Sequence, residues 1–246
     1  MELVRSIVVF NHTVDGNELM KTIPENFQGD IIIHGNFIYD YCGEREGECR
    51  IDVSGDLWVD GDVDMEDSFL NVHGDLACTG TIIARELTAN FVKCEHLLRV
   101  RRRLIAEDVI CRVFNVYIAE ISGDIICNSS DIETLHVRGD YSCSHKSKIE
   151  SAIISGNFVC EGCVKTLFMM ILGNLKCNGV IDASDFVVNG NAKIAHGLYS
   201  DYVKVGGNLG CDKVVDADNV TIDGNFTCKS YNIGSLTVKG LVSSKA

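Results

Sequence analysis

The stretch ISGNFVCEG, residues Ile154–Gly162, is one copy of a short repeat that runs through the second half of the chain. The repeat reads as a β-branched apolar residue, any residue, Gly, usually Asp or Asn, an apolar residue, any residue and, in most copies, Cys. Its glycine recurs every 16 or 17 residues, at Gly123, Gly139, Gly156, Gly173, Gly190, Gly207, Gly224 and Gly240. A nearly fixed period of this length is the signature of a repeat architecture in which each copy forms one structural unit.

The composition favours strands and tight turns over helices. The 246 residues include 23 glycines and one proline, and 46% of them are apolar. Gly serves tight turns, whereas Pro would remove a hydrogen bond from a strand ladder. Three short apolar segments fill each interval, and alternation within a strand turns one set of side chains inward. We therefore predict an all-β fold, a single-stranded parallel β-helix (solenoid) with three short strands per rung of about 17 residues and about 11 to 12 rungs.

The predicted β-helix domain spans residues 29–246. Residues 1–28 are predicted to form an N-terminal cap segment, because the first rung of a solenoid needs a cover. Within the cap segment, Ser6–Phe10 is predicted to be a strand and Asn17–Lys21 a short helical turn, with Pro24 closing the segment.

Two irregularities interrupt the early rungs. We assign the first rung glycine to Gly35, and the polar segment Tyr39–Arg50 then stretches the interval to Gly55 to 20 residues. Insertions in solenoids emerge as loops, which often carry binding. The acidic run Asp60–Asp67 lacks the ligand spacing and the terminal Glu of a calcium loop, so we interpret it as a solvated corner.

The chain has 12 cysteines. Seven of them lie four residues after a rung glycine, at Cys78, Cys127, Cys143, Cys160, Cys177, Cys211 and Cys228. Ile194 takes the same place after Gly190, and this exchange of Cys for Ile predicts an interior, apolar position for a reduced thiol. The pairs Cys160 with Cys163 and Cys42 with Cys49 lack the four ligands of a zinc site. We predict no metal site, no cofactor and no catalytic residue.

Two sets of charged side chains are candidates for an interaction surface. The residue after the rung glycine is an aspartate at Asp30, Asp56, Asp75, Asp124 and Asp140. It is an asparagine at Asn36, Asn157, Asn174, Asn191, Asn208 and Asn225. Stacked asparagines are expected to form an amide ladder, whereas the aspartates are either turn residues or an acidic surface. The second set is a basic stretch, expected to neutralise acidic side chains of an adjoining rung or to contact a phosphate or an acidic partner, at Arg99, Arg101, Arg102 and Arg103.

The net charge of −13 argues against nonspecific binding of nucleic acid or anionic lipid and favours a basic protein partner. No stretch approaches the roughly 20 apolar residues that span a bilayer. The N-terminal region lacks the cleavage site of a signal peptide. We therefore expect a cytoplasmic protein.

Rungs such as GDLACTGTIIARELTAN, residues 74–90, and GNLGCDKVVDADNVTIDGNF, residues 207–226, resemble the bactofilin family of polymer-forming cytoskeletal proteins. The resemblance covers about residues 74–240. It implies a right-handed, three-sided β-helix that assembles end to end into filaments without nucleotide and recruits partners to its surface. The chain differs from that family in its length, its folded N-terminal region and its row of cysteines.

Three functions are compatible with the sequence. The first is a non-enzymatic structural or scaffolding protein that associates with itself through the coil ends, as a homo-oligomer or a filament. The alternative is an acidic β-helical binding or inhibitor protein that mimics nucleic acid and targets a basic protein surface, such as a phage-type anti-host or anti-defence factor. The third, a carbohydrate-active enzyme, needs converging carboxylates, for which the candidates are Asp60, Asp62 and Asp64.

Overall fold

A computed structural model describes residues 6–23, 27–39 and 50–244 of the chain. It confirms the predicted fold class: 69% of the chain is in strands and 3% in helix, and the parallel strands form a β-solenoid with about 11 turns and about 17 residues per turn. The chain divides into two compact units, Met1–Ile121 (unit 1) and Ser122–Ala246 (unit 2). Among the described residues, no helix is long and apolar enough to cross a membrane.

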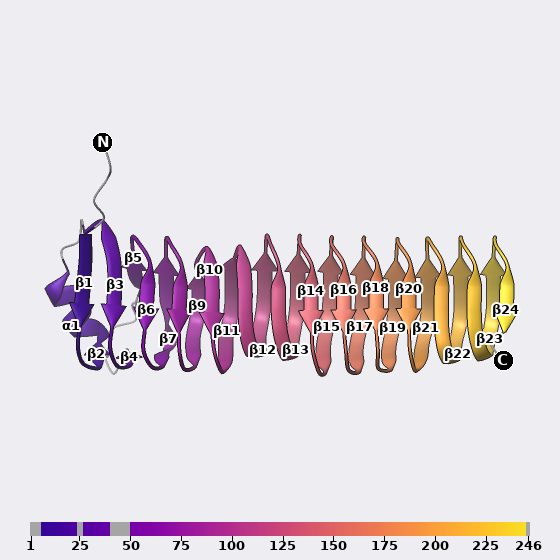
Figure 1. Ribbon diagram of the computed structural model, residues 1–246, viewed down its shortest axis with the longest axis horizontal. Helices are drawn as coiled ribbons and strands as arrows, with labels where there is room; N and C mark the ends of the chain where they lie inside the picture. Colours follow the sequence, from indigo (N-terminus) through magenta and orange to yellow (C-terminus); the bar gives the residue numbers. More distant parts are fainter. Residues whose placement is uncertain (1–5, 24–26, 40–49, 245–246) are drawn as a thin grey trace. The chain divides into compact units, whose positions relative to one another are not determined.

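Unit 2 is the regular part of the solenoid, with strands stacked in parallel (Figure 1). Each short strand pairs with the short strand one turn away, as β16 does with β14 and β18. The strands are β13 (Ile125–Val137), β14 (Tyr141–Cys143), β15 (Ser147–Ile154), β16 (Phe158–Cys160), β17 (Val164–Ile171), β18 (Leu175–Cys177), β19 (Ile181–Val188), β20 (Ala192–Ile194), β21 (Gly197–Val205), β22 (Leu209–Ile222), β23 (Phe226–Val238) and β24 (Val242–Ser244).

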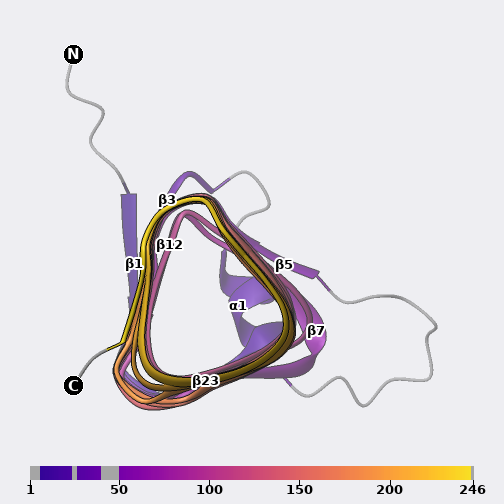
Figure 2. The ribbon, with the colours of Figure 1, turned by 90° about the vertical axis from the view of Figure 1, so that its right-hand side faces the viewer.

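Each coil of unit 2 has three faces, which outline a triangle in the view along the coil axis (Figure 2). A short stretch of strand forms the first face, and a longer stretch bends to form the other two. In β15 and β17 the bend falls at Glu150 and Leu167, which the ladder of paired residues skips. The coils of unit 2 turn counterclockwise toward the viewer in Figure 2, so they are right-handed, the usual hand of parallel crossovers.

The interior of both units contains the predicted row of cysteines. Cys143 pairs in register with Cys160, Cys160 with Cys177, and Cys177 with Ile194. In unit 1, Cys78 pairs with Cys94. These five cysteines and the other members of the row are buried, so the prediction of an interior apolar position is confirmed.

Unit 1 follows the same plan with less regular coils. Its elements are β1 (Ser6–Phe10), β2 (Val14–Asp15), α1 (Gly16–Thr22), β3 (Gly29–Ile33), β4 (Phe37–Ile38), β5 (Arg50–Val53), β6 (Leu57–Val59), β7 (Val63–Val72), β8 (Leu76–Cys78), β9 (Ile82–Thr88), β10 (Phe91–Cys94), β11 (Leu97–Ala106) and β12 (Asp108–Ile121). The predicted strand Ser6–Phe10 and the predicted helical turn Asn17–Lys21 are confirmed as β1 and α1.

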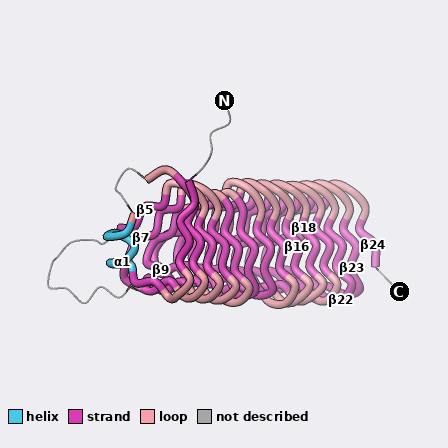
Figure 3. The backbone as a smooth tube through the Cα atoms, turned by 60° about the vertical axis from the view of Figure 1, so that its left-hand side comes forward, coloured by secondary structure: helices cyan, strands magenta, loops and turns pink. Residues whose placement is uncertain are grey.

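The first coil of unit 1 combines strands with the helix. β1 pairs in parallel with β3, and β2 pairs with β4, so these strands belong to the solenoid ladder. Asp15 caps α1 by accepting the N–H of Asn17 at 2.7 Å, and the helix buries Leu19. The helix lies beside β5 and β7 at one end of unit 1 (Figure 3). The cap function of residues 1–28 stays a prediction.

One assignment made from the sequence is wrong. Gly35 does not share a corner with Gly55, because Ile31 pairs with Leu57 and the N–H of Asp56 bonds to Asp30 Oδ1. The rung glycine of this coil is therefore Gly29, which precedes Asp30. Gly35 and Asn36 belong to the next corner, where Asn36 Oδ1 accepts the N–H of Asp62 at 2.9 Å. The physical reason is the long segment within this coil, which makes Asp30 and Asp56 26 positions apart.

Some sequence predictions fall on residues 1–5, 24–26, 40–49 and 245–246, which lie outside the described residues. They concern Pro24, the pair Cys42 and Cys49, and most of the segment Tyr39–Arg50.

Candidate functional site

A row of asparagine side chains follows one corner of unit 2. Each side-chain Oδ1 accepts the backbone N–H of the counterpart one coil later. Asn157 Oδ1 accepts the N–H of Asn174 at 3.0 Å, and Asn174 Oδ1 accepts the N–H of Asn191 at 2.9 Å. The Asn174 amide also donates to Asn157 Oδ1 at 3.2 Å. These contacts form the predicted amide ladder, and they tie successive coils together at a turn.

The five predicted aspartates occupy the same position in two groups, one in each unit. In unit 1, Asp56 Oδ1 accepts the N–H of Asp75 at 2.8 Å, and Asp30 Oδ1 accepts that of Asp56 at 3.0 Å. In unit 2, Asp124 Oδ1 accepts the N–H of Asp140 at 2.7 Å. One oxygen of each accepting carboxylate thus orders a turn. A role of these aspartates in binding a partner stays a prediction.

The three carboxylates considered for sugar chemistry lie in different settings. Asp62 Oδ1 accepts the N–H of Thr81 at 2.7 Å, so Asp62 orders a second corner of the coil. Asp60 Oδ2 lies 2.6 Å from His34 Nδ1. Asp64 is exposed on β7. Two of the three carboxylates therefore have partners on neighbouring coils.

The arginine stretch lies on β11, where that strand turns a corner of unit 1. Arg101 pairs with Glu66 and Asp67 of β7, which bulges at this corner. Arg102 Nη1 lies 3.1 Å from Glu86 Oε1. Arg103 donates two hydrogen bonds to Glu120, at 3.1 and 2.9 Å, and these raise the pKa of the Arg103 guanidinium above its usual value.

These arginines belong to a corner that is neutral as a whole. Arg85 of the neighbouring coil joins the cluster, with its guanidinium 5.3 Å from the ring centre of Phe69. The cluster contains four arginines, Arg85, Arg101, Arg102 and Arg103, and four carboxylates, Glu66, Asp67, Glu86 and Glu120. Two alternative roles were predicted for the arginine stretch from the sequence. These ion pairs correspond to the first of them, the neutralisation of acidic side chains on other coils. Arg99 is exposed on the same strand, and a contact with an acidic partner stays a prediction.

The buried thiols differ in their pKa values. Hydrogen bonds with the thiols of Cys127 and Cys160 lower the pKa values of Cys143 and Cys177, respectively, whereas the pKa values of Cys78 and Cys127 are raised. Burial raises the pKa of the Cys78 thiol from its ordinary value of 9.0 to about 12. A hydrogen bond with the Cys143 thiol and burial raise the pKa of Cys127. The thiols of Cys78 and Cys127 therefore stay protonated at neutral pH. Cys163, unlike Cys160, is exposed. Among the described residues, no group of three or more His, Cys, Asp or Glu side chains could hold a metal ion.

The last coil of unit 2 has a feature that the sequence did not reveal. Tyr231 of β23 pairs in register with Val215, whose position is interior and 0% exposed. The Tyr231 side chain is nevertheless 54% exposed. Leu236 and Val238 are also partly exposed, although their partners Val220 and Ile222 are buried. The strand β24 pairs with the start of β23, where Phe226 and Cys228 are buried, whereas no described strand pairs with the outer edge of the later part of β23, which contains Tyr231.

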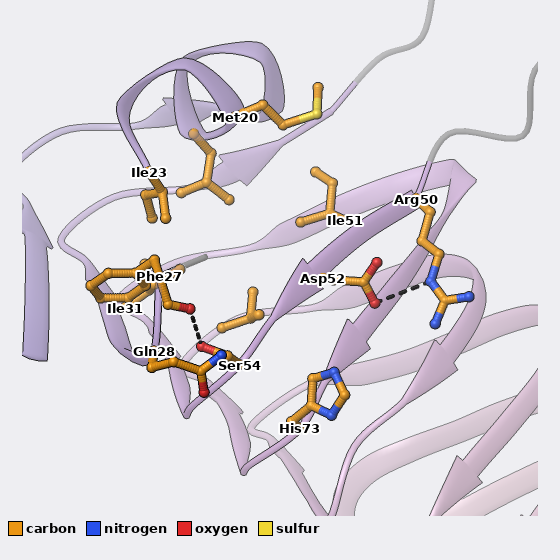
Figure 4. Close-up of a pocket in the computed structure, with 12 residues that line it drawn as sticks. Met20, Ile23, Phe27, Gln28, Ile31, Arg50, Ile51, Asp52, Ser54 and His73 are labelled. Atoms are coloured by element: carbon orange, nitrogen blue, oxygen red, sulfur yellow. Dashed lines mark hydrogen bonds and ion pairs between the residues drawn. The ribbon is translucent and has the colours of Figure 1, made fainter. Parts of the chain in front are cut away.

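A groove of about 410 Å³ lies between the end of α1 and β5 in unit 1. Apolar side chains from both sides face it, including Met20, Ile23 and Ile51, while the ion pair of Arg50 with Asp52 lies at its edge (Figure 4). Its lining adjoins residues 24–26 and 40–49 in the sequence, which are outside the described residues. The predicted binding role of the segment Tyr39–Arg50 therefore stays a prediction.

No family model, no curated protein and no solved structure matches the chain. The resemblance to bactofilins and the functions that it implies therefore stay predictions.

Proposed function

We propose that the protein is a non-enzymatic structural protein that associates with a second copy of itself through the last coil of unit 2. The observation that supports this function is the exposure of Tyr231 at a position that is interior in every preceding coil of the unit. Such a side chain lies on the part of β23 beyond Cys228, whose outer edge has no paired strand among the described residues. Another β-solenoid end of the same cross-section can cover this surface.

A second copy is the occupant that fits this surface best. Its own last coil has the same triangular outline and the same hydrogen-bond spacing, so the interior would continue across the contact. Residues 226–244 contain no carboxylate, and Lys239 is paired with Asp223 at 2.7 Å. Two last coils therefore repel each other less than two surfaces with the average negative charge of the chain would, although the net charge is −13.

The geometry of unit 1 favours a dimer over a filament. The predicted cap includes α1, which buries Leu19 and places Gly16 against the ring of Tyr39. A filament needs two different surfaces that bind each other. A single self-complementary surface that binds its own copy closes into a two-fold dimer. The filament that the resemblance to bactofilins implies would need the first coil as a second contact.

Sedimentation of the whole chain over a range of protein and salt concentrations tests this proposal. We expect a dimer that Tyr231→Lys converts to a monomer. Leu167→Lys is the control, because Leu167 is 59% exposed at a bend within unit 2 and away from its last coil. A parent protein that stays monomeric at high concentration would overturn the proposal. Species larger than a dimer would show that α1 does not close the first coil.

The alternative function is an acidic protein that mimics nucleic acid. It is supported by the net charge and by the aspartates stacked in groups of three and two. Replacing Asp30, Asp56, Asp75, Asp124 and Asp140 together by Asn tests it. The asparagines keep the Oδ1 acceptors, so binding to a basic protein should be lost while the fold persists. Binding that survives this replacement would contradict the mimicry.

A further inference from the structure

The first face of unit 1 carries a continuous apolar strip on its outer side. Val9 pairs in register with Ile32, Ile32 with Trp58, and Trp58 with Ala77. The Val9 side chain is 47% exposed and Trp58 is 53% exposed. Adjacent strands lie ~4.8 Å apart, so these side chains stand next to one another on consecutive coils.

The strip ends in a hollow at Ala77. This small side chain lies between Trp58 on the preceding coil and Lys93 on the following one. Phe91 lines the hollow as well, and its volume is about 370 Å³. A space of this size accepts one or two side chains of a partner.

The rim of the hollow is acidic. Asp60, Asp75 and Glu95 line it together with Lys93, so carboxylates outnumber ammonium groups there, and one of these carboxylates, that of Asp60, also contacts His34. Asp75 precedes the short strand β8, whereas Asp60 and Glu95 follow β6 and β10, so carboxylates lie on both sides of the hollow. A cation inside it would be flanked by negative charge.

We propose that this hollow binds an arginine side chain of a basic partner protein, whose neighbouring apolar residue rests on the strip. A guanidinium group stacks on an indole face and pairs with a carboxylate through two parallel hydrogen bonds, which an ammonium group cannot do. Trp58 provides the face, and Asp75 or Glu95 provides the carboxylate. The strongly acidic chain steers a basic protein to this surface.

Unit 2 provides an internal comparison for the same face. The outward positions that correspond to Trp58 and Ala77 are occupied there by Ser142, Val159, Lys176 and Lys193 in consecutive coils. This row contains no aromatic side chain on which a guanidinium could stack, and its two lysines disfavour a second cation. The arginine site is therefore specific to unit 1.

Trp58 is the chain's single tryptophan, so its fluorescence reports on the hollow directly. The probe is a blocked peptide, acetyl-Leu-Arg-Leu-Arg-Leu-amide, and its control replaces Arg by the neutral isostere citrulline. We expect a saturable change in fluorescence with the arginine peptide, with a Kd no weaker than ~1 mM at low salt. The citrulline peptide should bind at least about tenfold more weakly, and added salt should weaken the arginine peptide.

Two variants locate the site, each with a matched control in unit 2. Ala77→Phe fills the hollow and should abolish the saturable change, whereas Val159→Phe at the equivalent position should not. Glu95→Gln removes a rim charge without filling space and should weaken binding about three- to tenfold. Its control is Glu161→Gln, because Glu161 follows Cys160 as Glu95 follows Cys94.

Absence of a saturable change, equal binding of the citrulline peptide, or undiminished binding by Ala77→Phe would overturn the proposal. Circular dichroism shows that each variant is folded before it is used. The titration is repeated with Tyr231→Lys, which should bind the peptide as well as the parent does. The arginine site and the self-association through the last coil can therefore fail independently.

Discussion

Unit 1 and unit 2 are built on the same coil, but they differ in how strictly they repeat it. In unit 2, the asparagine row links residues 17 positions apart in one coil after another. In unit 1, the same row links Asp30 to Asp56 over 26 positions and Asp56 to Asp75 over 19. Unit 1 also contains the helix α1 and the bulges of β7 and β11.

This difference indicates where a solenoid can place chemistry. In a strict repeat, each side chain stands beside its own counterpart, so a row tends to keep one character along the unit. A change in coil length brings unlike residues together, as it does for Arg101 with Glu66. The irregular unit therefore contains the corner with the arginine ion pairs and the proposed arginine site, and the regular unit contains the proposed self-association surface at its last coil.

The largest difference that we expect concerns thiol reactivity. In a Cys42→Ser, Cys49→Ser background, Cys163 of unit 2 should be alkylated rapidly in the native protein. The buried row, including Cys78 of unit 1, should react at least about a hundredfold more slowly, because reaction requires local opening. Because its pKa is about 12, Cys78 should stay protonated and protected even at pH 9.

Mass spectrometry of the alkylated peptides gives the rate for each cysteine. Cys163→Ser should remove the fast reaction and leave the slow ones unchanged. Rapid labelling of Cys78 in the folded protein would contradict a dry interior in unit 1.

The next largest effect compares glycines at corners of the two units. In Gly162→Ala of unit 2, the added Cβ would lie 1.5 Å from the backbone oxygen of His145. We expect a loss of ~3 kcal/mol or more in the free energy of unfolding, because the backbone itself must shift. In Gly80→Ala of unit 1, the nearest atom is Asp62 Oδ1, at 2.1 Å, so part of the clash is relieved by a side-chain movement and the loss should be smaller.

Urea unfolding followed by circular dichroism measures these losses. Gly210→Ala is the control, since its Cβ would have no neighbour closer than 4.0 Å, and it should stay within ~1 kcal/mol of the parent. Equal losses for Gly162→Ala and Gly210→Ala would show that the corner is not tightly packed.

A smaller effect is expected from the asparagine ladder of unit 2. Asn174→Ala removes an acceptor for Asn191 and a donor to Asn157, so it should cost ~1–2 kcal/mol. Lys193→Ala changes an exposed side chain on β20 and should cost less than ~0.5 kcal/mol. Urea midpoints that do not distinguish the two variants would mean that the ladder adds little to stability.

The smallest effect tests the acidic row of unit 1 against the neutral row of unit 2. Asp56→Asn keeps the acceptor for the N–H of Asp75 and removes a negative charge between Asp30 and Asp75. We expect it to raise the free energy of unfolding by ~0.5 kcal/mol at low salt, and the gain should shrink in 1 M salt because repulsion is then screened.

The control for this substitution is Asp182→Asn, because Asp182 pairs in register with Lys165 rather than with another carboxylate. It should bring no gain in stability. A salt-independent gain in Asp56→Asn would point to a cause other than charge repulsion.

The candidate sites could be predicted from the sequence only in part. The asparagine ladder was predictable, because Asn157, Asn174 and Asn191 share one place in the repeat. The ion pairs of the arginines were not, because Arg101 and Glu66 are 35 positions apart and meet only through the bulge of β7. The pairing of Trp58 with Ala77 follows from the repeat, because they stand three residues after Gly55 and Gly74. The hollow was nevertheless missed, because it depends on the side chains that surround Ala77.

The sequence by itself determined that the chain is a parallel β-solenoid with cysteines inside. In such a coil the neighbour of a residue is its own counterpart one period later, so an interior position appears as a column that alternates between Cys177 and Ile194. Tertiary structure decided what the period does not encode. The pairing of Ile31 with Leu57 assigned the first corner to Gly29 instead of Gly35. The position of Tyr231 in the last coil left its side chain exposed, although its counterparts in the preceding coils are interior. Both outcomes depend on which strands pair, which the period alone does not specify.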